Sequence, residues 1–157
     1  MTVFAGADIS QVYSDLTQGN TPSVGTVAWI AGKAYKFVQY NSGAGPVAAV
    51  AGNVCYYYAP GGVSAGSTTV VTSDLSDSAN LGAGVLQAVI PNGSYGWIQI
   101  KGVATITPTL TAGSDGNALT AVGATDGTLD VSGLVTDAIV AYAVDASAKI
   151  ILCDFPY

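Results

Sequence analysis

The chain has 157 residues and a net charge of −6, built from four lysines and ten aspartates, with no histidine, arginine or glutamate. Charged residues make up 9% of the chain, against about 25% in a typical globular protein. This composition excludes a Ser-His-Asp triad, a Cys-His pair and an Arg clamp for phosphate. We therefore expect no enzyme. Either a partner covers part of the weakly charged surface, or Thr, Ser, Asn and Gln keep the protein soluble alone.

Several partners and locations are also disfavoured. The four lysines are separated in the sequence, whereas nucleic-acid binding needs clustered Lys and Arg. No apolar run reaches the roughly 18 residues of a membrane-spanning helix. Residues 1–8 lack the basic and apolar regions of a secretory signal peptide. We therefore expect that the chain binds neither nucleic acid nor membrane, and that the mature protein begins inside a cell.

The first 22 residues predict an arm and one short helix. Ile9, Val12, Tyr13 and Leu16 fall at the i, i+3, i+4 and i+7 positions of a helix. Asp8 is placed to cap it. A helix of about ten residues is marginal alone in water, so it must dock on its own domain or on a neighbour. Residues 1–22 are therefore either an arm that reaches a partner or an ordinary first element of the domain.

Residues 23–157 read as a single β domain. Runs of Val, Ile, Thr and Tyr alternate with Gly, Pro, Asn and Asp every 8–12 residues or so. This rhythm predicts a mainly β fold, an antiparallel β-sandwich or small barrel. The expected strands are Thr26–Ile30, Ala34–Tyr40, Asn53–Tyr58, Thr68–Thr72, Gly84–Ile90, Trp97–Ile106, Ala138–Val144 and Lys149–Phe155, with weaker ones at Ala118–Val122 and Thr128–Val131. We expect an exposed polar loop or short helical turn at residues 73–78.

One predicted strand carries candidate interface residues. Alternation places Ile98, Ile100, Ala104 and Ile106 toward the core. The opposite face is mostly polar yet holds Tyr95 and Trp97. A loop of the same chain can cover such a face, or the aromatic side chains can anchor a partner, as Trp and Tyr often do at interfaces. With Val3 and Phe4 of the arm, Tyr95 and Trp97 form the predicted protein interface.

The remaining reactive side chains have structural interpretations. Cys55 and Cys153 lie in apolar, strand-like runs, which favours two reduced core cysteines over a disulfide. Most aspartates neighbour Gly, Ser or Asn, where Asp forms turns and caps. Residues 114–117 and 126–127 supply oxygen ligands suited to calcium, but lack EF-hand spacing, so turns are favoured. We expect no metal and no cofactor.

The glycine-spaced hairpins suggest a family. The runs at residues 84–104 and 141–152, with Gly32–Asn41 before them, resemble small capsid decoration (cement) proteins of tailed bacteriophages. The likeness covers about residues 25–155 and lies in composition and rhythm. It implies a β-rich homotrimer, made in the host cytoplasm, that binds the major capsid protein on the exterior of the virion and stabilises contacts between capsomers. No catalytic residue is implied.

A second hypothesis is a glycan-binding or host-attachment module, such as part of a fibre or spike. It rests on nine tyrosines, including Tyr56-Tyr57-Tyr58, and on Trp29 and Trp97. Aromatic rings beside Ser and Thr can stack on sugars, although core aromatics with their polar tips at the rim are the simpler interpretation.

Overall fold

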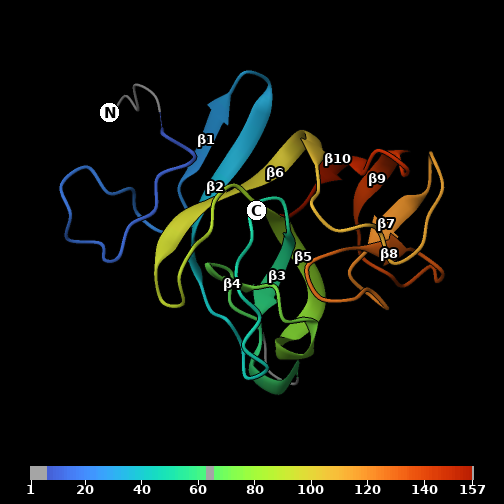
Figure 1. Cartoon of the computed structure of the whole chain (residues 1–157), viewed down its shortest axis with the longest axis horizontal. Coiled ribbons are helices and arrows are strands. Elements are labelled where there is room, and N and C mark those ends of the chain that lie inside the picture. The colour runs from blue at the N-terminus through green and yellow to red at the C-terminus, as the bar shows by residue number, and fades with distance from the viewer. Residues whose placement is uncertain (1–6, 63–65, 157) are drawn as a thin grey trace.

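Strands dominate the molecule, as the sequence predicts. A computed structural model describes residues 7–62 and 66–156 (Figure 1). Its elements are β1 (Val27–Ile30), β2 (Lys33–Tyr40), β3 (Val54–Tyr58), the 3-10 turn η1 (Pro60–Gly62), β4 (Val70–Thr72), the 3-10 turn η2 (Leu75–Asp77), β5 (Ser78–Leu86), β6 (Tyr95–Thr105), β7 (Ala118–Thr120), β8 (Asp130–Val131), β9 (Ile139–Asp145) and β10 (Ile150–Asp154).

The ten strands form one mixed sheet. Their order is β1-β2-β4-β3-β5-β6-β10-β9-β7-β8, with an additional pairing between β2 and β6. The expectation of an entirely antiparallel arrangement is wrong, because β4 runs parallel to β2, with Gln39 opposite Val70. The pairings among β2, β4, β3, β5 and β6 return to β2. Strands β10, β9, β7 and β8 continue outward from β6, on the right of Figure 1.

Most strands lie within two or three residues of their predicted positions, but β5 does not. It spans Ser78–Leu86, whereas the sequence favoured Gly84–Ile90. The strand contains Gly82 and Gly84, which have low β propensity. A Cβ atom at Gly84 would lie 2.8 Å from the carbonyl oxygen of Gln99, and one at Gly82 would lie 2.9 Å from the Phe155 ring. These glycines permit close packing that no local pattern reveals.

The predicted N-terminal helix is wrong. Residues 7–22 form turns, bends and one isolated bridge. Asp8 accepts hydrogen bonds from the backbone N–H and the hydroxyl of Ser10, and Asp15 does the same for Thr17. Such short-range bonds compete with helix formation. Tyr13 instead forms an isolated β-bridge with Tyr95, which attaches the segment to the start of β6.

Two hydrophobic clusters lie on opposite sides of β2 and β6. The main core fills one side and includes Val38, Ile98, Ala104, Ile151 and Phe155. The aromatic cluster on the other side consists of Tyr35, Phe37 and Trp97, with Ile9, Tyr13 and Tyr95 among the partly buried side chains packed against it. We call the side of the sheet opposite the main core the outer face.

Two buried aspartates, Asp74 and Asp77, hold neighbouring loops together around η2 through hydrogen bonds. Of the two alternatives for residues 73–78, the short helical turn is confirmed by η2, and residues 73, 74, 77 and 78 are buried rather than exposed. Asp77 accepts hydrogen bonds from the N–H groups of Ala44 and Gly61, and Asp74 accepts one from Gly45. Burial opposes ionisation of Asp74, but hydrogen bonds from Ser76 and Gly45 outweigh it and lower its pKa.

Candidate interaction surface

Three neighbouring strands carry an exposed apolar row on the outer face. Leu152 of β10 lies directly between Val103 of β6 and Tyr142 of β9 in the strand register. These side chains are 42–46% exposed, and Val144, two residues after Tyr142, is 50% exposed. Their neighbours Ala104, Ile151 and Ala143 point the opposite way, into the main core. We call Val103, Tyr142, Val144 and Leu152 the apolar patch.

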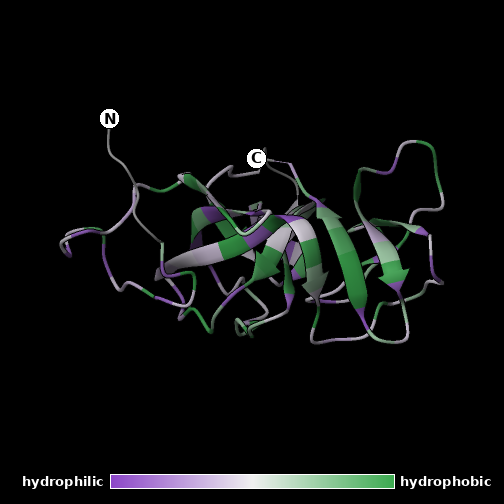
Figure 2. Cartoon of the chain, turned by 90° about the horizontal axis from the view of Figure 1, so that it is seen from above, coloured by the Kyte–Doolittle hydropathy of each residue, from purple (hydrophilic) through white to green (hydrophobic). Residues whose placement is uncertain are grey.

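The sequence forms this patch because β9 and β10 are apolar on both faces. In β9 the buried residues Val140, Ala141 and Ala143 are interspersed with the exposed Ile139, Tyr142 and Val144. A half-solvated antiparallel strand normally places polar residues on its exposed face. Figure 2 shows hydrophobic colouring along much of the strands on the right of the molecule, where β9 and β10 lie. The apolar patch therefore has the composition of a covered surface.

One ion pair borders the patch. Lys101 and Asp154 lie opposite each other on β6 and β10, and their side chains form a salt bridge. Each lies two residues along its strand from Val103 or Leu152, on the same face. The side chains are 27% and 57% exposed, so the pair contributes little to stability. Because the two charges neutralise each other, the pair adds no net charge to this surface. Its polar groups could still fix the orientation of a bound protein.

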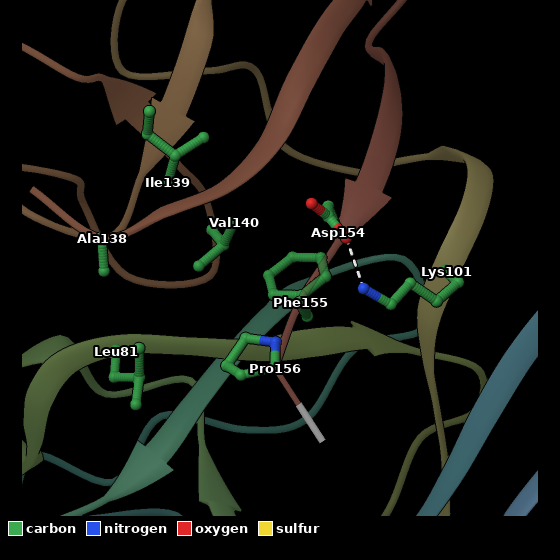
Figure 3. Close-up of a pocket in the computed structure, with 8 residues that line it drawn as sticks. All are labelled: Leu81, Lys101, Ala138, Ile139, Val140, Asp154, Phe155 and Pro156. Carbon is green, nitrogen blue, oxygen red and sulfur yellow. Dashed lines mark hydrogen bonds and ion pairs between the residues drawn. The ribbon is translucent and has the colours of Figure 1, made fainter.

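A shallow cavity of about 480 Å³ opens beside the ion pair. Figure 3 shows Asp154 and Lys101 on one side, Phe155 and Pro156 at the centre, and Leu81 with Ala138, Ile139 and Val140 on the other side. The lining is mostly apolar, and its only titratable side chains are the paired Lys101 and Asp154. This arrangement suits insertion of an apolar side chain from a partner. It offers no nucleophile with an adjacent base.

The structure describes two of the four predicted interface residues, Tyr95 and Trp97, and neither is fully exposed. Val3 and Phe4 lie outside the described residues. Trp97 is 1% exposed, in edge contact with Phe37 at 5.2 Å between ring centroids. Tyr95 is half-buried and stacks on Phe37 at 6.3 Å. Of the two explanations for Trp97, the structure shows cover by the same chain, because residues 7–13 pack over the cluster.

The apolar patch was not singled out from the sequence. Its members lie in the predicted strands at 97–106, 138–144 and 149–155. Alternation within each strand could have identified Tyr142, Val144 and Leu152 as the face opposite the core. The missing information was the register, which aligns Val103, Leu152 and Tyr142 across three strands.

The other reactive side chains have the structural roles favoured above. Cys55 and Cys153 are free and buried, and burial raises the pKa of the Cys153 thiol to about 12. Tyr56 is fully buried, and its hydroxyl group bonds the backbone of Thr125 and Thr128.

The residues considered for calcium make turn and loop contacts. Asp115 accepts a hydrogen bond from Ala146 N–H, and Asp126 accepts one from Leu75 N–H. Within residues 7–62 and 66–156, no three side chains of the metal-binding types His, Cys, Asp and Glu are grouped closely enough to hold an ion. No helix in the same ranges is long and apolar enough to cross a membrane.

No protein family, curated protein or solved structure matches this chain.

Proposed function

We propose that this chain is a non-enzymatic structural protein that binds the outer surface of a viral capsid and stabilises contacts between capsomers. The apolar patch carries the proposal. Three side chains in register on rigid strands, bordered by a neutral ion pair, present a preformed surface that needs no reordering to bind. The resemblance of the hairpins to phage decoration proteins supplies the class of partner.

The partners are the major capsid protein and further copies of the chain, assembled as a trimer on the exterior of the virion. A stable specific contact buries about 1,600 Å² in total, far more than four side chains provide. The patch would therefore form the centre of a larger contact. Several contacts made by one oligomer reinforce each other, so each can remain weak. The closed cycle of pairings through β2, β4, β3, β5 and β6 supports a small barrel as the scaffold.

Co-sedimentation with capsids tests this function. The purified chain is mixed with expanded shells of the phage that encodes it, and its mass in solution is measured by light scattering. We expect a stable oligomer that sediments with the shells. The variant Leu152→Asp should lose one or both properties, because it places a charge in the middle of the apolar patch. Gln18→Asp, which adds the same charge at an exposed site, is the matched control.

The proposal would be overturned if the chain is monomeric and stays in the supernatant when expanded shells sediment. Equal sedimentation of Leu152→Asp and the unchanged chain would leave capsid binding in place but remove the apolar patch from it. The two results separate the function from the surface assigned to it.

One observation favours the glycan-binding alternative. Trp29 of β1 is 66% exposed, with its indole ring available to stack on a sugar, whereas Trp97 is buried and cannot contribute. A glycan array distinguishes the two functions. If the chain binds a glycan and the Trp29→Ala variant does not, attachment to a host is supported. If no glycan on the array is bound, only the capsid proposal remains.

A further inference from the structure

Lys36 occupies a position built for an apolar side chain. It lies on β2 between Ala34 and Val38, both of which face the main core, and directly opposite Ile98 of β6. The residue is only 5% exposed. Burying an ammonium group is unfavourable unless an anion or several hydrogen bonds compensate it. The surroundings of this side chain therefore indicate whether its charge is balanced.

In the described part of the chain, Lys36 forms hydrogen bonds only with neutral groups. Its Nζ atom donates to the hydroxyl oxygen of Tyr57 at 3.0 Å and to the carbonyl oxygen of Thr68 at 2.8 Å, and lies 5.0 Å from the centre of the Tyr57 ring. Within residues 7–62 and 66–156 no carboxylate lies within ion-pair distance of it, since the salt bridge there joins Lys101 and Asp154. Burial lowers the pKa of Lys36 accordingly.

A cavity of about 230 Å³ adjoins this lysine. Lys36, Tyr57 and Ser67 form part of its lining, and Ala79, Leu81 and Pro156 form an apolar part. Leu81 and Pro156 also line the larger cavity of Figure 3, so the two hollows share a wall. An ammonium group has three N–H donors. Among residues 7–62 and 66–156, Tyr57 and Thr68 accept two of them, which leaves the third for an acceptor in the cavity.

We propose that this cavity binds a small carboxylate with a short apolar chain. The carboxylate accepts the third N–H of Lys36 and balances its charge, and the chain rests on Leu81 and Pro156. A single cation matches a singly charged anion, whereas a phosphate group normally requires several charged or backbone donors. This binding site is independent of the apolar patch and of the capsid proposal.

Nuclear magnetic resonance titration with sodium butyrate tests the proposal. The full chain, labelled with ¹⁵N, is titrated at constant ionic strength while the amide signals of Ser67 and Thr68 are followed. We expect saturable shifts with a dissociation constant on the order of millimolar, as suits a ligand of so few atoms. Butyramide, which has nearly the same shape without the charge, should produce much smaller shifts. Absence of saturable shifts with butyrate overturns the proposal.

Two variants locate the binding. Lys36→Met removes the charge at similar length and should weaken butyrate binding about tenfold or more, while Lys149→Met, which removes a lysine elsewhere, should not. Ala79→Asp places a competing carboxylate in the exposed part of the lining and should also weaken binding. Unchanged binding by Lys36→Met, or by Ala79→Asp if the first variant does not fold, overturns the proposal.

A carboxyl group of the protein itself is a second source of the same chemistry. A chain extended by four residues after Tyr157 carries its terminal carboxyl group further along. Equal butyrate binding by the extended and unextended chains supports a free carboxylate as the ligand. Binding by the extended chain alone would assign the site to the terminus of the chain and overturn the proposal.

Discussion

The two halves of the outer face are both rich in apolar side chains, but one half is buried and the other is exposed. On β2 and the start of β6, the aromatic cluster is covered by the chain's own residues 7–13 and by Val24, Ala28 and Ile30. On the end of β6 and on β10 and β9, Val103, Leu152 and Tyr142 remain exposed. The comparison shows that this protein covers an apolar sheet face where its own chain can reach it. The exposed half is therefore the surface that we assign to the proposed partner.

The cover is attached by few interactions. Tyr13 and Tyr95 exchange two backbone hydrogen bonds, at 2.9 and 2.8 Å, and the Tyr13 ring meets Phe37 edge-on at 5.7 Å. Residues 14–20 beyond this point are exposed. The segment therefore covers the aromatic cluster together with Val24, Ala28 and Ile30, which also pack against it.

The largest difference between the halves should be in stability. Trp97→Ala removes a fully buried ring and should lower the free energy of unfolding by about 3–5 kcal/mol. Leu152→Ala removes a side chain that is 42% exposed and should cost much less. Urea denaturation of both variants measures the difference. Similar losses would mean that the exposed half is also covered in solution, as expected if the chain self-associates there.

Removing the cover alone should have an intermediate effect. Tyr13→Ala deletes a half-buried ring and its contact with Phe37, and should cost about 1–2 kcal/mol. Trp97 should then become more exposed to water and its fluorescence should shift to the red. The measurement is made in a Trp29→Phe background, because Trp29 is exposed and its long-wavelength emission would obscure a shift of Trp97. An unshifted spectrum would show that residues 7–13 do not shield the cluster.

Charge in the exposed half should affect association more than stability. Leu152→Lys should change the free energy of unfolding by only about 0.5 kcal/mol, as is usual for exposed positions. It should nevertheless reduce self-association or capsid binding, measured by light scattering and co-sedimentation. Gln18→Lys is the control for added charge. A large loss of stability in the Leu152→Lys monomer would indicate that the patch packs within its own chain.

The smallest expected effect is a loosening of the cover in acid. Hydrogen bonds from the hydroxyl and N–H of Ser10 lower the pKa of Asp8, and those of Thr17 lower the pKa of Asp15. A depressed pKa in the folded state means that the stabilisation is present above the unfolded pKa, near 3.9, and is lost as the pH falls through the lower folded value. Trp97 emission in the Trp29→Phe background should therefore shift slightly between about pH 5 and pH 2.

The matched control for the acid experiment is Asp8→Asn with Asp15→Asn. Asparagine retains a hydrogen-bond acceptor without a titrating carboxyl group. The double variant should show a smaller shift over the same range. An equal shift would assign the acid effect to other groups, such as Asp74.

Local patterns were sufficient for most strands. Residues such as Val54–Tyr58 and Ile150–Asp154 are rich in the apolar, β-branched and aromatic side chains that favour strands. They failed at residues 9–16, where a helical period coincides with side chains that form turns and with a backbone pairing to Tyr95 about 80 residues away. They also failed at β5, whose glycines are needed only because Gln99 and Phe155 lie so close.

The amino-acid sequence alone determined the low charge of this protein and the absence of histidine and arginine. It also determined most of the strands, through their alternating side chains. Tertiary structure decided which apolar surface is covered. Trp97 and Leu152 both lie on the face opposite the core, and alternation within a strand cannot distinguish them. The difference arises because residues 7–13 return to Tyr95 while no described segment returns to Leu152. Likewise, only the register of β2 with β6 placed Lys36 opposite Ile98, beside the core, since such pairings depend on contacts between residues far apart in the sequence.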